Sequence, residues 1–263
     1  MKNNQAIGIF DSGVGGLSVL QHIQQLLPNE TIIYIADNGY APYGCKTNEH
    51  VKQRSQIIID YFISQGVKAI VIACNTATAA IIEYFRQQYE LPFIGVEPGI
   101  KPAIRQTRNG HIGIMATSTT LASTRYHELC KRFSQQVQIH SQACPRLADQ
   151  IEAGALDTPE IHHLLRIYLD ALHNKHIDTI VLGCTHYSFI KHLIQKMTDN
   201  SIKLIDTSHA IAEQLKRVLE QEELRSHSSV GSVQYLSSGS TEQTKATIYN
   251  LLSIDVAVMP FDL

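Results

Sequence analysis

The sequence lacks a long hydrophobic segment. Its longest apolar runs, such as Ala69–Cys74, cover six or seven residues, whereas a membrane-spanning helix needs about 20. The first residues, Met1–Gln5, lead directly into a predicted strand and carry no apolar stretch of the secretory type. We therefore expect a cytoplasmic protein without membrane contact. In that compartment its five cysteines would be reduced thiols rather than disulfides.

The chain also lacks an excess of charge of one sign. Its formal net charge is -2, and charged residues make up 17% of the 263 residues. Because no broad basic surface is implied, nucleic acid is not expected as a partner. The hydrophobic share of 44% is typical of a globular protein, and the length allows one large domain or two of ordinary size.

The spacings that hold metals and phosphates are absent too. The thirteen histidines include the neighbours His162 and His163, but no His-x3-His or Cys-x2-Cys pattern occurs, so no metal site is predicted. The stretch Gly13-Val-Gly15-Gly16 differs from the dinucleotide pattern Gly-x-Gly-x-x-Gly, and no Gly-Lys-Ser/Thr follows it. No lysine stands at a strand end beside a phosphate loop, as a pyridoxal cofactor would require. We expect no cofactor.

Short β-branched runs alternate with amphipathic segments, which is the pattern of an α/β protein with a mostly parallel sheet. The predicted strands are Ile7–Phe10, Thr31–Ala36, Ala69–Cys74, Phe93–Val96, His111–Ala116, Val137–Ser141, Thr179–Cys184, Lys203–Asp206, Val233–Leu236 and an edge strand at Val256–Met259. Helical spacing of apolar residues predicts helices at Leu17–Leu27, His50–Ser64, Ala77–Tyr89, Thr124–Phe133, Ile161–His173 and Ala210–Leu219.

Two of the predicted strands are followed by the same type of segment. The segments 68–76 and 178–186 each lead from a β-branched run into a cysteine, Cys74 or Cys184, and then into polar residues that open a helix. This repeat predicts two similar α/β halves. We expect the first to span 1–96 plus 207–263, and the second to span 97–206. Because ligands of open α/β sheets bind beyond the carboxyl ends of the strands, both cysteines should face a cleft between the halves.

Two thiols that face one pocket suit one reaction in particular. One thiol can remove a proton from one face of a carbon while the other returns a proton to the opposite face. A helix amino terminus favours the reactive thiolate, and the backbone N–H groups of Asn75-Thr76 and Thr185-His186 suit a carboxylate. A single cysteine at a strand end is often only a small buried residue. The repetition argues against that interpretation.

Three other segments carry candidate site residues. Asp11-Ser12 ends the first strand, where the carboxylate either caps a helix or contacts substrate and tunes a thiol. The segment 37–44 is either a turn or a substrate loop that presents backbone N–H groups and a tyrosine at the cleft rim. His186 stands two residues after Cys184 and could share a proton with it.

Five motifs together resemble the glutamate racemases. They are Asp11-Ser12-Gly13-x-Gly15-Gly16, Pro42-Tyr43-Gly44, Cys74-Asn75-Thr76-Ala77, Gly95-Val96-Glu97-Pro98 and Gly183-Cys184-Thr185-His186-Tyr187. The resemblance runs from residue 7 to about 208 and is specific because the motifs occur in order with plausible spacing. It implies two flavodoxin-like parallel-sheet domains related by pseudo-twofold symmetry, with the active site in the cleft between them.

The resemblance also implies roles for individual residues. Cys74 would take the proton from D-glutamate and Cys184 from L-glutamate, without a cofactor, so that the enzyme supplies D-glutamate for peptidoglycan. Asp11, His186 and Glu152 match positions that assist the thiols, although the residues around Glu152 follow the family pattern only loosely. The positions matching substrate contacts are Asp11, Ser12, Tyr43, Gly44, Asn75, Thr76, Thr185 and His186.

Alternatives remain open at this point. Within the same superfamily, aspartate or another amino acid could be the substrate. A hydrolase or amidotransferase would use one cysteine as nucleophile with His186 as base, but a two-residue spacing gives poor geometry for such a pair. An inactive binding protein would not need paired cysteines. The sequence decides neither the oligomeric state, for which a homodimer is the commonest assembly, nor whether a cell-wall precursor activates the enzyme, as in part of this family.

Overall fold

The computed structural model describes residues 2–198 and 201–262. Its strands are β1 (Ile7–Asp11), β2 (Thr31–Ala36), β3 (Ala69–Ile72), β4 (Phe93–Gly95), β5 (His111–Ala116), β6 (Gln138–Ala143), β7 (Thr179–Gly183), β8 (Lys203–Ile205), β9 (Ser232–Ser237) and β10 (Val258–Pro260). Its α-helices are α1 (Leu17–Leu26), α2 (Asn48–Ser64), α3 (Asn75–Gln88), α4 (Ile100–Ile104), α5 (Ser118–Ala122), α6 (Thr124–Phe133), α7 (Leu147–Glu152), α8 (Pro159–His173), α9 (Lys191–Met197), α10 (Ser208–Gln221) and α11 (Thr241–Leu252). Short 3-10 helices are η1 (Lys2–Asn4), η2 (Asn38–Tyr40), η3 (Tyr43–Cys45) and η4 (Thr185–Ile190).

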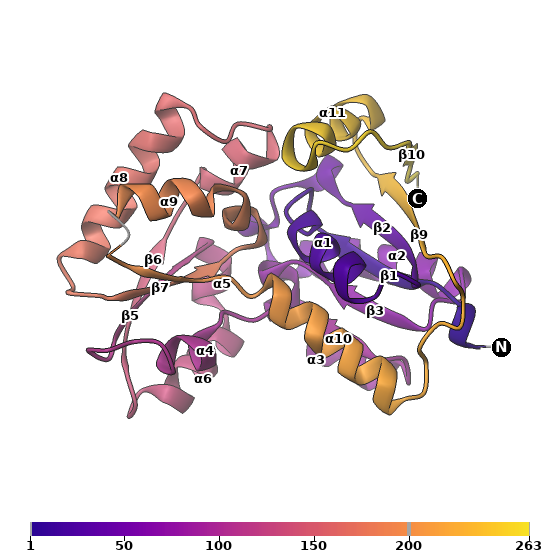
Figure 1. Ribbon diagram of the computed structural model, residues 1–263, viewed down its shortest axis with the longest axis horizontal. Helices are drawn as coiled ribbons and strands as arrows, with labels where there is room; N and C mark the ends of the chain where they lie inside the picture. Colours follow the sequence, from indigo (N-terminus) through magenta and orange to yellow (C-terminus); the bar gives the residue numbers. More distant parts are fainter. Residues whose placement is uncertain (1, 199–200, 263) are drawn as a thin grey trace.

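The strands form two separate parallel sheets, which lie side by side in Figure 1. The first sheet has the order β10-β9-β2-β1-β3-β4, and the second has the order β6-β5-β7-β8. Each pairing in both sheets is parallel. The last strands, β9 and β10, return to the first sheet after the chain has built the second. The predicted fold class of two parallel-sheet domains is confirmed.

Helices cover both faces of the first sheet. Leu20 of α1, Leu215 of α10 and Ile248 of α11 belong to one apolar cluster, whereas Phe62 of α2 and Phe85 of α3 belong to the cluster on the opposite face. Because both faces are buried, the strands carry continuous apolar runs rather than an alternating pattern. β1 and β3 are buried at every position.

The second sheet is covered in the same way. Leu147 of α7, Leu165 of α8 and Ile194 of α9 pack on one face, and Ile100 of α4 and Tyr126 of α6 pack on the other. Each half therefore has its own apolar clusters, and Phe189 of η4 packs against one cluster of each half. Residues 1, 199, 200 and 263, which fall inside the predicted halves, lie outside the described residues.

The predicted elements are confirmed with ends that differ by at most two residues. Five helices, α4, α5, α7, α9 and α11, were not predicted. The signal for α11 is present in the sequence, because the Ser240 side chain caps it by accepting from the Gln243 N–H at 3.2 Å. In the described part of the chain, no helix is long and apolar enough to cross a membrane.

Candidate active site

The strand ends bring the predicted site residues to the facing edges of the two sheets. β1 ends at Asp11 and lies in register with β3, whose last residue precedes Cys74 by two positions. β7 ends at the residue before Cys184 and pairs with β5, which ends just before Thr117. Parallel strands place all their carboxyl ends at one edge of a sheet, so Cys74 of the first half and Cys184 of the second both reach the space between the halves.

Cys74 is the N-cap residue of α3 and is buried. Its sulfur accepts from the Ala77 N–H at 3.5 Å and, as a thiol, donates to Ser12 Oγ at 3.7 Å. Burial raises the pKa of this thiol well above its usual value, and the charges of Asp11 and Cys184 add to the rise. The group is therefore a protonated thiol at neutral pH.

Asp11 lies beside this thiol and is fully buried. Its carboxylate accepts from the Ser12 N–H at 2.8 Å and from the Gly16 N–H at 2.6 Å. Burial raises its pKa to about 6; the charge of Glu152 adds to the rise, and the charge of His186 opposes it. A carboxyl with this pKa changes charge close to physiological pH, which suits a group that assists proton transfer.

Cys184, His186 and Glu152 form a hydrogen-bonded chain on the second half. His186 Nδ1 lies 3.7 Å from the Cys184 sulfur, and His186 Nε2 lies 2.6 Å from Glu152 Oε2. Burial by itself lowers the pKa of His186, but the hydrogen bonds and charges of its two partners together raise it well above the usual value. The ring is therefore an imidazolium that donates through both nitrogens.

The glycine-rich turn of the first half packs directly against this chain. The Val14 N–H donates to Glu152 Oε2 at 2.9 Å, which links the two halves. A Cβ atom at Gly13 would lie 2.2 Å from Glu152 Oε2, and one at Gly15 would lie 2.4 Å from His186 Nδ1. The glycines are thus required by close approach between the halves rather than by binding of a phosphate.

Asn75 and Thr76 follow Cys74 at the start of α3. Both side-chain amide atoms of Asn75 are buried, and neither has a hydrogen-bond partner among the described residues. Thr76 Oγ1 lies 2.9 Å from Thr117 Oγ1 and 3.2 Å from Thr120 Oγ1, so three hydroxyl groups meet across the two halves. A buried amide without a partner is costly unless a ligand supplies one, by about 1–3 kcal/mol.

Tyr43 and Gly44 approach the same region from the loop after β2. The expectation of a tyrosine side chain at the cleft rim is wrong for Tyr43, which is fully buried and donates its hydroxyl to Asp37 Oδ2 at 2.5 Å. Only its main chain is left to contact a ligand. A Cβ atom at Gly44 would lie 2.9 Å from Thr117 Cβ, so this main chain runs close against the second half.

A cavity of about 600 Å³ opens beside these groups. It is lined by Ser12, Glu152 and His186 together with residues of the loop after β2, of α7 and of α11. Its α11 residues are Gln243, Thr244, Ala246, Thr247 and Asn250. This wall is not apparent from the predicted elements, because they include no helix at α11.

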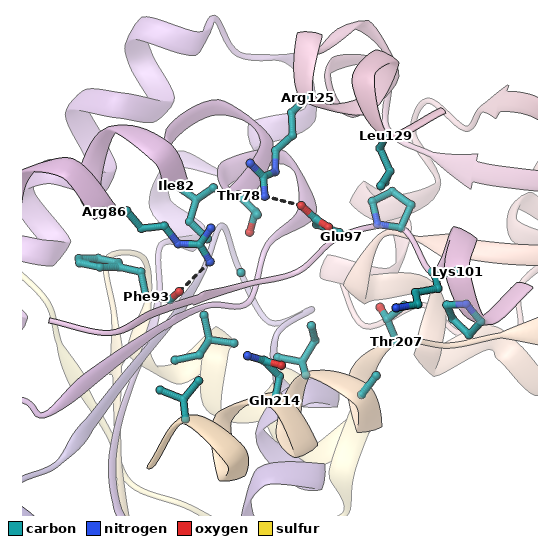
Figure 2. Close-up of a pocket in the computed structure, with 18 of the residues that line it drawn as sticks. Thr78, Ile82, Arg86, Phe93, Glu97, Lys101, Arg125, Leu129, Thr207 and Gln214 are labelled. Atoms are coloured by element: carbon teal, nitrogen blue, oxygen red, sulfur yellow. Dashed lines mark hydrogen bonds and ion pairs between the residues drawn. The ribbon is translucent and has the colours of Figure 1, made fainter. Parts of the chain in front are cut away.

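A second cavity, of about 680 Å³, lies where the chain crosses between the halves. Figure 2 shows Arg125 directed at Glu97 and Arg86 bound to the Phe93 carbonyl in its wall. None of the predicted catalytic residues lines it. We assign the chemistry to the first cavity, because Ser12, Glu152 and His186 line it, and Ser12 and His186 in turn contact the sulfurs of Cys74 and Cys184. Among the described residues, no cluster of three or more His, Cys, Asp or Glu side chains could hold a metal ion.

Comparison with known proteins identifies the family of this chain. Residues 7–215 match the Asp/Glu/hydantoin racemases. The chain belongs to this family. A glutamate racemase of Ectopseudomonas mendocina is 45% identical over 99% of this chain and 100% of that protein. One of Pseudomonas syringae pv. tomato is 50% identical over 82% of this chain and 78% of that protein. The predicted resemblance to glutamate racemase, and with it the prediction of an isomerase, is confirmed.

Solved structures agree with the sequence relatives. A glutamate racemase isoform of Bacillus anthracis superposes with a TM-score of 0.92 at 31% identity, over 99% of this chain and 98% of that one. The Francisella tularensis glutamate racemase, in complex with D-glutamate, gives 0.87 at 29% identity over 99% and 98%. The Escherichia coli enzyme, in complex with L-glutamate and the activator UDP-MurNAc-Ala, gives 0.81 at 28% identity over 97% of both chains.

Proposed function

We propose that this racemase interconverts L- and D-glutamate by a two-base mechanism in which Cys74 and Cys184 act on opposite faces of the α-carbon. The observation that carries the proposal is the opposed pair of buried cysteines, each at the carboxyl edge of its own sheet and each beside a different assisting group. The substrate is suggested by the family's glutamate racemases, two of which are structures with bound glutamate.

The two thiols differ in their surroundings before substrate binds. Cys74 is held as a thiol by burial and by the Asp11 charge. Cys184 instead lies 3.7 Å from Nδ1 of His186, a cationic ring that is placed to share a proton with the sulfur during the reaction. The proposal therefore gives the two sulfurs different partners, the Asp11 carboxylate for Cys74 and the His186 ring for Cys184.

The proton transfers balance without any further reactant. The Cys184 thiolate takes the α-proton as its new S–H, and the Cys74 thiol gives its proton to the opposite face of the same carbon. The product is D-glutamate, and the protonation states of the two sulfurs are exchanged. In the reverse direction, Cys74 takes the proton from D-glutamate. Asp11, with its pKa of about 6, is placed to help the Cys74 thiol change charge.

Negative charge that develops on the α-carboxylate must be stabilised as the proton leaves. Asn75 is suited to this because its buried amide has no partner within the described part of the chain. Thr76 and Thr185, which open the helices after the two cysteines, would present backbone N–H groups to the same carboxylate. Ser12, Tyr43 and Gly44 would complete the contacts, the last two through their main chain.

Single replacement of each cysteine tests the mechanism. Cys74→Ala and Cys184→Ala should each abolish interconversion measured from either enantiomer, while Cys130→Ala, a half-buried thiol outside the site, should keep it. Full racemase activity in either active-site variant would end the two-base proposal.

The substrate is tested by measuring the activity of the wild-type enzyme on glutamate and on aspartate. A pocket that fits one methylene more should favour one of the two substrates by about 1–3 kcal/mol. A preference for aspartate would move the substrate assignment to the aspartate racemases.

The cellular setting is proposed on the same basis. We propose a cytoplasmic enzyme that supplies D-glutamate for peptidoglycan, which is supported by the need for two reduced thiols. The division into a half at 1–96 plus 207–263 and a half at 97–206 is supported by which strands belong to each sheet.

Activation by a cell-wall precursor is also proposed. It is supported by the Escherichia coli complex and is tested by adding UDP-MurNAc-Ala to the assay. A homodimer is proposed as the commonest assembly and is tested by analytical ultracentrifugation.

A further inference from the structure

The loop that carries Tyr43 and Gly44 is held by a buried polar cluster beside the active site. We call residues 37–46 the 37–46 loop; it contains η2 and η3 and joins β2 to α2. Its first residue, Asp37, is fully buried, and Arg54 on α2 is 6% exposed. Neither side chain lines the 600 Å³ cavity, so any effect of this pair on substrate must act through another residue.

Asp37 receives three donors at short distance. Arg54 donates from Nη2 to Oδ1 at 2.8 Å and from Nε to Oδ2 at 3.2 Å. Tyr43 donates its hydroxyl to the same Oδ2 at 2.5 Å. The planar guanidinium fixes the orientation of the carboxylate through two bonds, and the carboxylate in turn fixes the Tyr43 ring.

The two ends of the loop are attached to both halves of the molecule. The Asp37 N–H donates to the Asp11 carbonyl at 3.0 Å, which ties the loop to the strand end that carries the catalytic carboxylate. Thr119, on α5 of the second half, donates its hydroxyl to the Gly44 carbonyl at 2.7 Å. The guanidinium of Arg54 stacks on the ring of Tyr40, and Arg54 Cζ lies 3.6 Å from the ring centroid. The Tyr43–Gly44 main chain is thus fixed from three directions.

Stability alone gives a weak reason for this cluster. A buried ion pair pays a large desolvation cost, and well-packed apolar side chains often replace it without loss of stability. What an apolar replacement cannot supply is a fixed direction for the Tyr43 hydroxyl. The cluster is therefore better explained by placement of the loop than by its contribution to the free energy of unfolding.

We propose that Arg54 and Asp37 are positioning residues for substrate binding, which hold Tyr43 by its hydroxyl so that the Tyr43–Gly44 main chain keeps its place against the substrate. The inference rests on the proposed contact of Tyr43 and Gly44 with glutamate. Because the two thiols are placed by other strands, loss of the cluster weakens binding more than it slows proton transfer.

The test measures KM and kcat for both enantiomers in the full-length enzyme, together with the melting temperature. Tyr43→Phe removes only the hydroxyl and should raise KM about tenfold or more, with a smaller change in kcat, since small displacements of binding groups cost up to about 10²-fold. Arg54→Leu should raise KM further, and Arg54→Lys should recover part of the loss. The matched control is Glu30→Gln, which breaks another buried ion pair of the first half, with Lys68 at 2.5 Å. It should lower the melting temperature and leave KM unchanged.

Two results would overturn the proposal. One is an unchanged KM in Tyr43→Phe and Arg54→Lys with a lowered melting temperature, as in the Glu30 control. The other is a fall in kcat at constant KM, which would place the cluster in the chemical step. If Arg54→Leu does not fold, the Tyr43→Phe variant decides. The cysteine variants report on the two-base mechanism independently, so failure of one proposal is distinguished from failure of the other.

Discussion

Replacement of Asp11 by asparagine should change how the stability of the enzyme depends on pH. Burial raises the pKa of Asp11 from 3.8 to about 6, which corresponds to about 3 kcal/mol at about 1.4 kcal/mol per pKa unit. Below pH 3.8 the carboxyl is protonated in the folded and the unfolded chain, and burial costs no charge. Between about pH 4 and 6 the unfolded chain releases this proton first, so the wild-type protein loses stability as pH rises.

Asp11→Asn is neutral at every pH and does not suffer this loss. The free energy of unfolding of the variant minus that of the wild type should therefore rise by up to about 3 kcal/mol between pH 4 and 7. Asparagine keeps only one acceptor oxygen for the Ser12 and Gly16 N–H groups, which shifts the difference by a constant amount. The prediction therefore concerns how the difference in free energy of unfolding changes with pH, not its absolute value. Urea denaturation at steps of pH, extrapolated linearly to water, measures it.

Asp178→Asn provides a control of opposite sign. Burial raises the pKa of Asp178, but hydrogen bonds from the Thr107 hydroxyl and from the Arg108 and Asn109 N–H groups outweigh it, so the pKa is lowered. Its stabilisation is present above the unfolded-state pKa and is lost as pH falls. The free energy of unfolding of Asp178→Asn minus that of the wild type should thus fall or stay level as pH rises. A flat or falling difference for Asp11→Asn would refute the argument that burial dominates at Asp11.

The remaining predictions concern the contact between the halves. Glu152→Gln removes the charge that helps to raise the His186 pKa; we expect that pKa to fall in an NMR titration and kcat to fall by about 10²-fold. Unchanged values of both would remove Glu152 from the mechanism. Gly13→Ala places a methyl group against the Glu152 carboxylate and should lower kcat/KM by about tenfold or more. Its control, Gly110→Ala, lies in open space at φ +78 and should cost about 1 kcal/mol of stability without loss of activity; equal activity losses in both variants would contradict the role of the contact.

The strands and, apart from α11, the larger helices could be predicted because their signals are local. β-branched runs such as Ala69–Ile72 and the amphipathic pattern of α8 depend on neighbours in sequence, and both appear as expected. The repeated cysteine segments also predicted where the two cysteines lie, because parallel strands place equivalent residues at the same edge of a sheet. The short helices α4, α5 and α7 span five or six residues, too few to show a periodic pattern.

The contacts that shape the site could not be predicted, because they join residues that are distant in sequence. Nothing around Glu152 indicates that its carboxylate reaches the Val14 N–H, 138 positions away. Arg54 is an unremarkable residue of α2 until the fold brings it to Asp37. The same holds for Tyr43: its motif predicts proximity to substrate, but only the structure shows that its buried hydroxyl is bonded to Asp37.

Isotope content of the first product tests the two-base claim most directly. Wild-type enzyme is incubated with α-protiated L-glutamate in D2O, without added cofactor, and the α-position of both enantiomers is followed at low conversion by proton NMR after chiral separation. The two-base mechanism predicts that newly formed D-glutamate carries deuterium, delivered by a Cys74 thiol already exchanged with solvent, while the remaining L-glutamate keeps its proton. D-Glutamate that retains the original proton would mean that one base carries it from face to face, and would contradict the account.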